Sequence, residues 1–251
     1  TLPAAALEGL HGEADDGSAR GGIFVLSRFH MGQLPPHAQS LAVLTSNGLD
    51  DSAFADGDNR ADHFLYASTP SAGLQLLLTM WPDVRAALPN ASLNVYYGFW
   101  PYAMWNEQPH LIKMRAQLEP MLRQPGVTYY GMRSELELAA AYAAAGFYTY
   151  PSDKPETSGI ALMKAQACGC IPVTSGQRRS ALPETCGEWD RGPTGRDGFI
   201  AGNPEWQADY LAALLAAVRT PEPELRAARA RMKQAARARF SWAAVAKQWT
   251  E

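Results

Sequence analysis

Residues 151–175 read PSDKPETSGIALMKAQACGCIPVTS. This stretch combines the end of an apolar run, an acidic loop, a Ser/Thr/Gly turn and an amphipathic segment that leads into a second apolar run. In an open parallel sheet, a loop that joins a strand to a helix lies at the carboxyl edge, where ligands bind. The stretch therefore predicts a ligand-binding strand–loop–helix unit of an α/β protein.

The rest of the chain repeats this alternation of short apolar runs with longer amphipathic segments. Apolar residues recur at a spacing of three to four residues over 74–88 and again over 136–145, which is typical of helices. The pattern predicts right-handed βαβ units and hence an α/β, Rossmann-like, doubly wound, mostly parallel sheet with helices on both faces. Strands are predicted at residues 23–26, 41–44, 63–67, 92–97, 127–130, 147–150, 171–174 and 198–201.

The two ends of the chain differ from this central pattern. Residues 1–22 are rich in Ala, Gly and acidic side chains without a sustained period, so we expect a flexible N-terminal segment. After Pro204 only helical spacing remains, which predicts a helical C-terminal extension. Its basic residues form either an anion-binding patch or, as we favour, a solvated helix face: Arg226, Arg229, Arg231, Lys233, Arg237 and Arg239.

Composition narrows the classes of partner. A formal net charge of −3 over 251 residues and a pI near 6.0 give no overall reason to bind nucleic acid or an anionic membrane. No apolar run reaches the roughly 18 residues of a membrane span, and the first residues lack a signal-peptide pattern, so we expect a cytoplasmic protein. The three cysteines, two of them in the triplet CGC, predict free or buried thiols rather than disulfides or a metal site.

The loop before the helix carries the residues best suited to bind a ligand. Glu156 is expected just past the sheet edge, and Thr157, Ser158 and Gly159 would open the helix with backbone N–H groups left for a phosphate or a sugar hydroxyl. The structural alternative is a capped helix start, with Ser or Thr as N-cap and an acidic residue favoured by the helix dipole.

The same stretch resembles the signature of the retaining GT-B glycosyltransferases of the group 1, family 4-like kind, in their C-terminal donor-binding domain. In that signature a Glu, a short turn and a second Glu eight residues later precede an A-x-G-x-P-V turn, which here reads AQACGCIPV. Residues 63–99 look like the opening βαβ unit of that family's donor domain, and residues 127–131 resemble its next strand. Residues 240–242, Phe-Ser-Trp, resemble its closing helix, so the likeness covers roughly residues 23–250.

The resemblance implies a domain organisation and an activity. Residues 59–251 would form the nucleotide-sugar donor domain, and residues 23–58 would be a remnant or linker from the acceptor side. The acceptor-binding N-terminal domain would be absent from this chain. The implied reaction transfers a sugar from a nucleoside-diphosphate sugar to an unknown acceptor with retention of configuration. No metal or other cofactor is expected.

Site residues can be carried over one at a time. The resemblance implies that Glu156 is the catalytic residue and contacts hydroxyls of the donor sugar. It also implies that the backbone groups of Thr157, Ser158 and Gly159 bind the donor. The second Glu, which usually meets the ribose, is replaced by Lys164. A lysine has three donors and no acceptor, so Lys164 either reaches a phosphate or is a surface lysine without a role.

The first loop of the donor domain departs from the family pattern as well. Ser68 and Gly73 fall at donor-binding positions, but Ala72 stands where the family usually has an Arg before Gly-Leu. Neutralisation of a diphosphate would therefore be weakened. These departures leave an alternative open, in which the chain is a catalytically degenerate, glycosyltransferase-like binding or scaffold domain.

An aromatic-rich segment follows the second predicted strand of the donor domain. Its rings would either stack on a base or sugar or, as we favour, pack beneath a long loop. The residues concerned are Tyr96, Tyr97, Phe99, Trp100, Tyr102 and Trp105.

Overall fold

The computed structural model describes residues 22–99, 101–176, 179–193 and 203–249. The expected flexible segment at residues 1–22 falls almost wholly outside this part of the chain, and the strand predicted at 198–201 falls outside it entirely.

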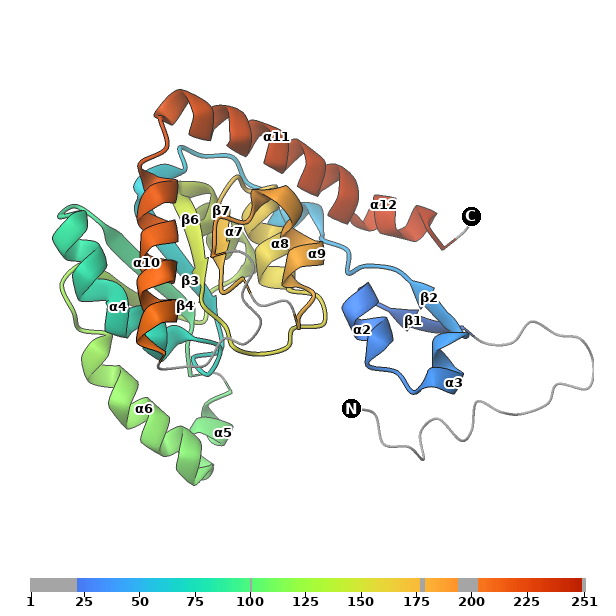
Figure 1. Cartoon of the computed structure of the whole chain (residues 1–251), viewed down its shortest axis with the longest axis horizontal. Coiled ribbons are helices and arrows are strands. Elements are labelled where there is room, and N and C mark those ends of the chain that lie inside the picture. Colours follow the sequence, from blue (N-terminus) through green and yellow to red (C-terminus); the bar gives the residue numbers. More distant parts are fainter. Residues whose placement is uncertain (1–21, 100, 177–178, 194–202, 250–251) are drawn as a thin grey trace, which may run out of the picture.

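A five-stranded parallel sheet forms the centre of the molecule (Figure 1). Its strand order is β5-β4-β3-β6-β7, and every neighbouring pair is parallel. The predicted α/β class is therefore confirmed. The strands are β3 (Arg60–Ser68), β4 (Ser92–Tyr97), β5 (Val127–Gly131), β6 (Ala145–Tyr150) and β7 (Ile171–Thr174).

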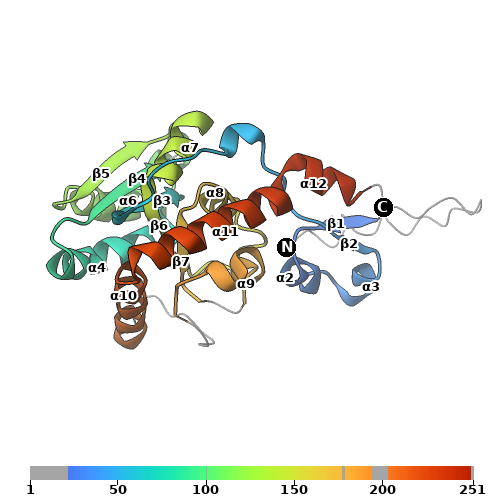
Figure 2. The same cartoon turned by 90° about the horizontal axis from the view of Figure 1, so that it is seen from above.

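Helices cover both faces of this sheet (Figures 1 and 2). One face carries α4 (Leu74–Ala87), α6 (Pro109–Met121) and α10 (Pro204–Val218). The other carries α7 (Glu135–Ala144), α8 (Ile160–Ala167) and α11 (Glu222–Phe240). The chain winds from β3 outward through β4 and β5, then returns to β6 on the other side of β3. The winding direction thus reverses between β3 and β6, which defines a topological switch point.

The core lies on both sides of the central strands. Phe64 of β3 and Phe147 of β6 are fully buried, and their rings lie 5.9 Å apart. Trp81 of α4 meets Phe64 edge-on at 5.8 Å between ring centroids. Such near-continuous apolar strands are typical of parallel sheets that are covered on both faces. Burial of each large apolar side chain of this kind stabilises the fold by about 1.5–3 kcal/mol.

The first two predicted strands form a separate small unit. β1 (Ile23–Val25) pairs in parallel with β2 (Ala42–Leu44), and α2 (Arg28–Gly32) and α3 (Pro36–Gln39) connect them. This two-stranded sheet is not part of the five-stranded one. A small apolar cluster holds it together, formed by Val25, Leu34 and Ala38.

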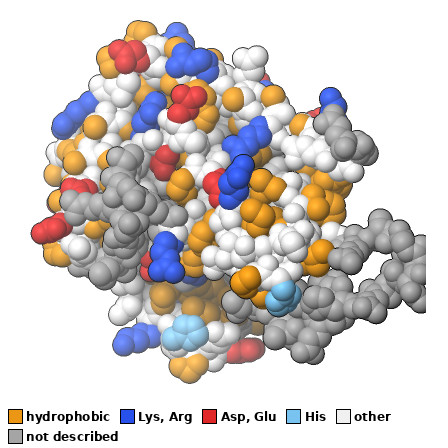
Figure 3. Space-filling model, turned by 45° about the vertical axis from the view of Figure 1, so that its right-hand side comes forward, with side chains coloured by type: hydrophobic (Ala, Val, Ile, Leu, Met, Phe, Trp, Pro, Cys, Tyr) orange, Lys and Arg blue, Asp and Glu red, His pale blue; other side chains and the backbone are white. Residues whose placement is uncertain are grey.

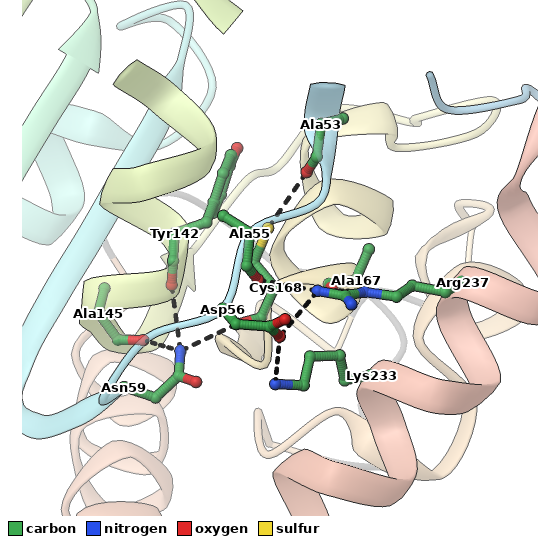
Figure 4. Close-up of polar contacts among 10 residues, drawn as sticks. All are labelled: Ala53, Ala55, Asp56, Asn59, Tyr142, Ala145, Ala167, Cys168, Lys233 and Arg237. Atoms are coloured by element: carbon green, nitrogen blue, oxygen red, sulfur yellow. Dashed lines mark hydrogen bonds and ion pairs between the residues drawn. The ribbon is translucent and has the colours of Figure 1, made fainter. Parts of the chain in front are cut away.

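Residues 45–59 link this unit to the main sheet, and Asn59 fixes the point where this link enters β3 (Figure 4). It is buried, and its backbone has a positive φ of 43°, which Asn tolerates better than most residues. Its side-chain amide nitrogen lies 2.9–3.2 Å from three carbonyl oxygens, those of Tyr142, Ala145 and Cys168. One side chain thus joins β6 to the ends of α7 and α8.

The C-terminal helices return to the same link (Figure 4). Lys233 and Arg237 of α11 contact the carboxylate of Asp56 at 2.7 and 3.0 Å, and Arg237 also donates to the carbonyls of Ala55 and Ala167. The link also contains a short 3-10 helix, η2 (Asp51–Ala53).

The segment expected to be a closing helix is two helices. α11 ends at Phe240, α12 (Trp242–Lys247) follows at once, and Ser241 between them caps α12. Leu49 of the link inserts its backbone at this break: its N–H donates to the Phe240 carbonyl at 2.6 Å, and its carbonyl accepts from Trp242.

Two expectations for the helices are corrected. The segment after β4 contains α5 (Tyr102–Glu107) and α6, where we expected a long loop. The basic face of α11 is not uniformly solvated, because the Arg229 side chain is 7% exposed and its guanidinium lies 5.9 Å from the Phe147 ring. Arg226, by contrast, is 80% exposed.

The cysteines are free and buried, as predicted. Burial raises the pKa of all three thiols, which makes them poor nucleophiles. Cys186 ends the short helix α9 (Leu182–Cys186), which η3 (Gly187–Trp189) follows.

Candidate functional site

The loops that follow β3 and β6 meet at the switch point. Gly73, the N-cap of α4, has a φ of 92°, and a Cβ atom there would lie 2.2 Å from the carbonyl oxygen of Pro151. Only glycine allows this approach without displacement of the backbone. The Tyr66 hydroxyl donates to the Thr69 carbonyl at 2.7 Å and so stabilises the loop after β3. The sheet thus holds two loops of distant sequence in direct contact.

Glu156 is held at this edge by Tyr150, the last residue of β6. The Tyr150 hydroxyl donates to Oε1 of Glu156 at 2.6 Å. Burial, and then the charge of Glu156, raise the pKa of Tyr150 well above its usual range, so the hydroxyl keeps its proton. Ser68 Oγ lies 3.5 Å from the same hydroxyl and acts as the donor, because the tyrosine hydrogen points to Glu156. Ser68, Tyr150 and Glu156 therefore form one hydrogen-bonded row across the ends of β3 and β6.

The turn before α8 leaves backbone donors available. Gly159 is the N-cap of α8, with a φ of 89° and no side-chain cap. The alternative of a Ser or Thr N-cap is therefore wrong. Within the described residues, the N–H groups of Thr157, Ser158 and Gly159 have no hydrogen-bond partner. Such groups at the start of a helix attract anions and hydroxyl oxygens.

The small N-terminal unit lies against the same turn. Ser27 Oγ donates to the Thr157 carbonyl, and Asn47 Nδ2 donates to Ser158 Oγ, each at 2.8 Å. These contacts bring the N-cap residue of α2 and a residue of the link to one side of the turn, although both are more than 100 residues away in sequence.

A third contact comes from α9. Glu184 accepts hydrogen bonds from the backbone N–H groups of Arg28 and Phe29, both at 2.8 Å. The carboxylate thus satisfies free donors in the first turn of α2.

Lys164 lies on α8 and is occupied by a neighbouring acid. Its ammonium lies 2.8 Å from the carboxylate of Glu135, the first residue of α7, and its side chain is 20% exposed. The structure therefore places Lys164 between α7 and α8, with a partner that the sequence pattern did not indicate. It forms no hydrogen bond with the other predicted site residues within the described part of the chain.

Lys154 lies at the same pair of loops and was not predicted from the sequence. It follows β6 by four residues, and its ammonium donates to Ser71 Oγ at 2.6 Å across the two loops. The clue in the sequence was a lone lysine between Asp153 and Glu156, which gives no sign of the residue it would reach.

Some residues of the aromatic segment pack in the core, and others lie at the ends of the strands. Phe99 and Trp105 are buried and meet edge-on at 5.1 Å between ring centroids, as the packing interpretation predicted. Tyr96 stacks on Tyr130 at 4.7 Å, and burial raises the pKa of Tyr96 to about 12. Trp100 and the side chain of Tyr102 lie outside the described structure.

The described residues contain neither a candidate metal site nor a helix that could span a membrane. No group of three or more His, Cys, Asp or Glu side chains is placed to hold a metal ion. No helix in this part of the chain is long and apolar enough to cross a membrane.

Solved structures share this fold. The HepE protein of Anabaena, in complex with UDP and glucose, is 14% identical with a TM-score of 0.67, and 92% of this chain covers 62% of that one. Sucrose-phosphate synthase of Thermosynechococcus elongatus is 19% identical with a TM-score of 0.68, at 90% and 56% coverage. A glycosyltransferase of Rickettsia africae is 12% identical with a TM-score of 0.71, at 100% and 66% coverage.

At these identities the likeness shows the fold alone, and this chain spans less than two thirds of the length of each of the three structures. Among curated proteins, none matches the sequence. A family model does: that of the glycosyl transferases group 1 matches residues 63–239, which include both loops of the switch point. The chain therefore belongs to the glycosyl transferases of group 1.

Proposed function

We propose that this chain is the donor-binding part of a retaining glycosyltransferase that uses a nucleoside-diphosphate sugar. Glu156 accepts hydrogen bonds from hydroxyls of the donor sugar. The N–H groups of Thr157, Ser158 and Gly159 donate to phosphate or hydroxyl oxygens.

The position of Glu156 is the observation that carries this proposal. A carboxylate fixed by a buried tyrosine at the switch point of a doubly wound sheet lies where such sheets bind ligands. Free backbone donors follow it directly in the chain. The fold neighbour HepE of Anabaena, which was solved in complex with UDP and glucose, supports this choice of ligand class.

The acceptor in this proposal is bound by a further domain on the side of the β1–β2 unit. An isolated two-stranded sheet is only marginally stable in water. Its side chains Phe24, Val43 and Leu44 are 44–56% exposed, and Trp249 lies 5.6 Å from the Phe24 ring. Figure 3, which brings this side of the molecule forward, shows hydrophobic side chains close together on the surface. A continuation of the small sheet would cover them.

The proposed chemistry breaks the bond between the anomeric carbon and the diphosphate oxygen and forms a bond to an acceptor oxygen on the same face of the sugar. The leaving phosphate oxygen takes the proton of the acceptor hydroxyl. No pair of carboxylates at glycosidase spacing is needed. The proposal includes no metal ion, because hydrogen-bond donors of the protein stabilise the departing diphosphate.

Calorimetric titration with UDP, GDP, ADP and their glucose conjugates tests the donor site. We expect saturable binding of one nucleotide sugar. Glu156→Ala should weaken binding of the sugar conjugate by about tenfold or more, and that of the bare nucleotide much less, because the lost contacts are to sugar hydroxyls. Glu107→Ala, a change at an exposed residue of α5, is the matched control.

Equal losses for conjugate and nucleotide would contradict the role of Glu156. Absence of all binding at millimolar ligand would favour the second candidate, a non-catalytic binding or scaffold domain. One observation favours that candidate: Lys164, at the position of the family's second Glu, has its ammonium held by Glu135.

A further inference from the structure

Lys154 places a positive charge between the two loops of the switch point. The loop after β3, from Thr69 to Gly73, contains no basic residue. The ammonium of Lys154 nevertheless reaches it from the loop after β6 and donates to Ser71 Oγ at 2.6 Å. Ser71 Oγ lies 3.3 Å from Thr69 Oγ1, so the charge lies beside two hydroxyl groups.

No acid in the described structure neutralises this charge. Other partly buried lysines have carboxylate partners, since Lys164 pairs with Glu135 and Lys233 with Asp56. Lys154 is also partly buried, but its ammonium has only a neutral hydroxyl as partner among the described residues. Glu156, the acid of the predicted site, forms no ion pair with Lys154 within the described residues, and its Oε1 accepts from the Tyr150 hydroxyl.

The surroundings of Lys154 suit a phosphate. Hydroxyl groups of Thr69 and Ser71 can donate to phosphate oxygens, and α4 begins at Leu74, three residues after Ser71. A cation without a carboxylate partner keeps its full charge for an anionic ligand. Because Thr69 to Gly73 carry no basic side chain, the positive charge beside these hydroxyl groups comes from Lys154 on the loop after β6.

We propose that Lys154 binds the diphosphate of the donor and supplies the charge that Ala72 does not. This proposal rests on the proposed function, since it names a residue of the same site. It makes Lys154 a determinant of affinity for the diphosphate and leaves base and ribose recognition to other residues.

A series of ligands that differ only in their number of phosphate groups tests the role of Lys154. Uridine, UMP and UDP, with the guanosine and adenosine series alongside, are titrated into the wild type, Lys154→Met and Lys154→Arg. Lys113→Met, at an exposed residue of α6, is the matched control. We expect Lys154→Met to lower affinity for the diphosphate by about tenfold to hundredfold and to leave the nucleoside unchanged.

Two further readouts separate binding from folding. Lys154→Arg keeps the charge and is expected to retain most of the diphosphate affinity, whereas Lys113→Met should match the wild type. The affinity of the wild type should fall with added salt more steeply than that of Lys154→Met, because one charged contact has been removed. A melting temperature close to that of the wild type confirms that the variant is folded.

The outcomes distinguish this inference from the function on which it rests. If the wild type binds a diphosphate and Lys154→Met binds it equally well, the role of Lys154 is overturned and the donor site stands. If the variant loses nucleoside and diphosphate binding to the same extent, Lys154 supports the loops and does not bind phosphate. If the wild type binds no nucleotide, both proposals fall.

Discussion

The hydrogen bond between Tyr150 and Glu156 can be removed by a substitution that deletes one oxygen atom. Tyr150→Phe removes the donor but keeps the ring, which packs against Tyr148 at 5.8 Å. Glu156 then loses the contact that orients it. We expect nucleotide-sugar binding to weaken by about 0.5–1.5 kcal/mol, the net value of one hydrogen bond, as measured by calorimetry.

Tyr210→Phe is the matched control for this change. Tyr210 is fully buried, and its hydroxyl donates to the Val173 carbonyl at 2.9 Å. Its substitution should lower stability by a similar amount without a change in donor affinity. Unchanged affinity in Tyr150→Phe would show that Glu156 does not depend on this tyrosine.

At the scale of elements, the contact between α11 and the link should depend on pH. The hydrogen bond from Lys233, together with Arg237, lowers the pKa of Asp56. A lowered pKa stabilises the folded state above the unfolded value of about 3.9, and this contribution is lost as the pH falls through the folded value. Because Asp56 is largely exposed, we expect Asp56→Asn to cost only about 0.2–1 kcal/mol at neutral pH.

Denaturant unfolding of the wild type and Asp56→Asn between pH 7 and pH 3 measures this contribution. The difference in free energy of unfolding should be constant down to about pH 5 and should shrink below about pH 4. Asp58→Asn, at an exposed acid of the same link, provides the control. A difference that stays constant through pH 3 would rule out the ion pair as its source.

Strands were easier to predict from the sequence than site contacts. Residues 92–97 and 171–174 coincide with β4 and β7, because both are short apolar runs with clear breakers beside them. α6 was missed because it lies at the periphery and buries only Leu111 and Leu118, so its apolar period is weak.

The loop that carries Glu156 was predicted from local pattern, and its neighbours were not. Lys154 and Ser71 are 83 residues apart, and Tyr150 and Ser68 are 82 apart. Both pairs come together only because β3 and β6 are adjacent in the sheet, although two strands separate them in the chain. The ion pair between Lys164 and Glu135 likewise depends on the packing of α7 against α8.

At the scale of the whole molecule, Glu184 connects the small N-terminal unit to the main body. Glu184→Ala removes the acceptor of the Arg28 and Phe29 N–H groups. We expect faster hydrogen exchange at these two amides and in α2, with little change in the five-stranded sheet, because local contacts open independently of the core. Hydrogen exchange followed by mass spectrometry measures both regions at once.

Glu188→Ala, at an exposed acid of η3, is the control for this experiment. It should leave the exchange of α2 unchanged. If Glu184→Ala also leaves α2 unchanged, the contacts of Ser27 and Asn47 with the turn at Thr157 and Ser158 are sufficient to hold the unit.

The insertion of Leu49 between Phe240 and Trp242 has a consequence for synthesis of the protein. Leu49 is translated before the residues that enclose it, and Phe240 follows it roughly ten to forty seconds later at ~5–20 residues per second. Until then Leu49 lacks Phe240, which completes the apolar cluster that Leu49 forms with Met163. A nascent chain that stalls before Phe240 therefore carries this cluster uncovered, as a binding surface for chaperones.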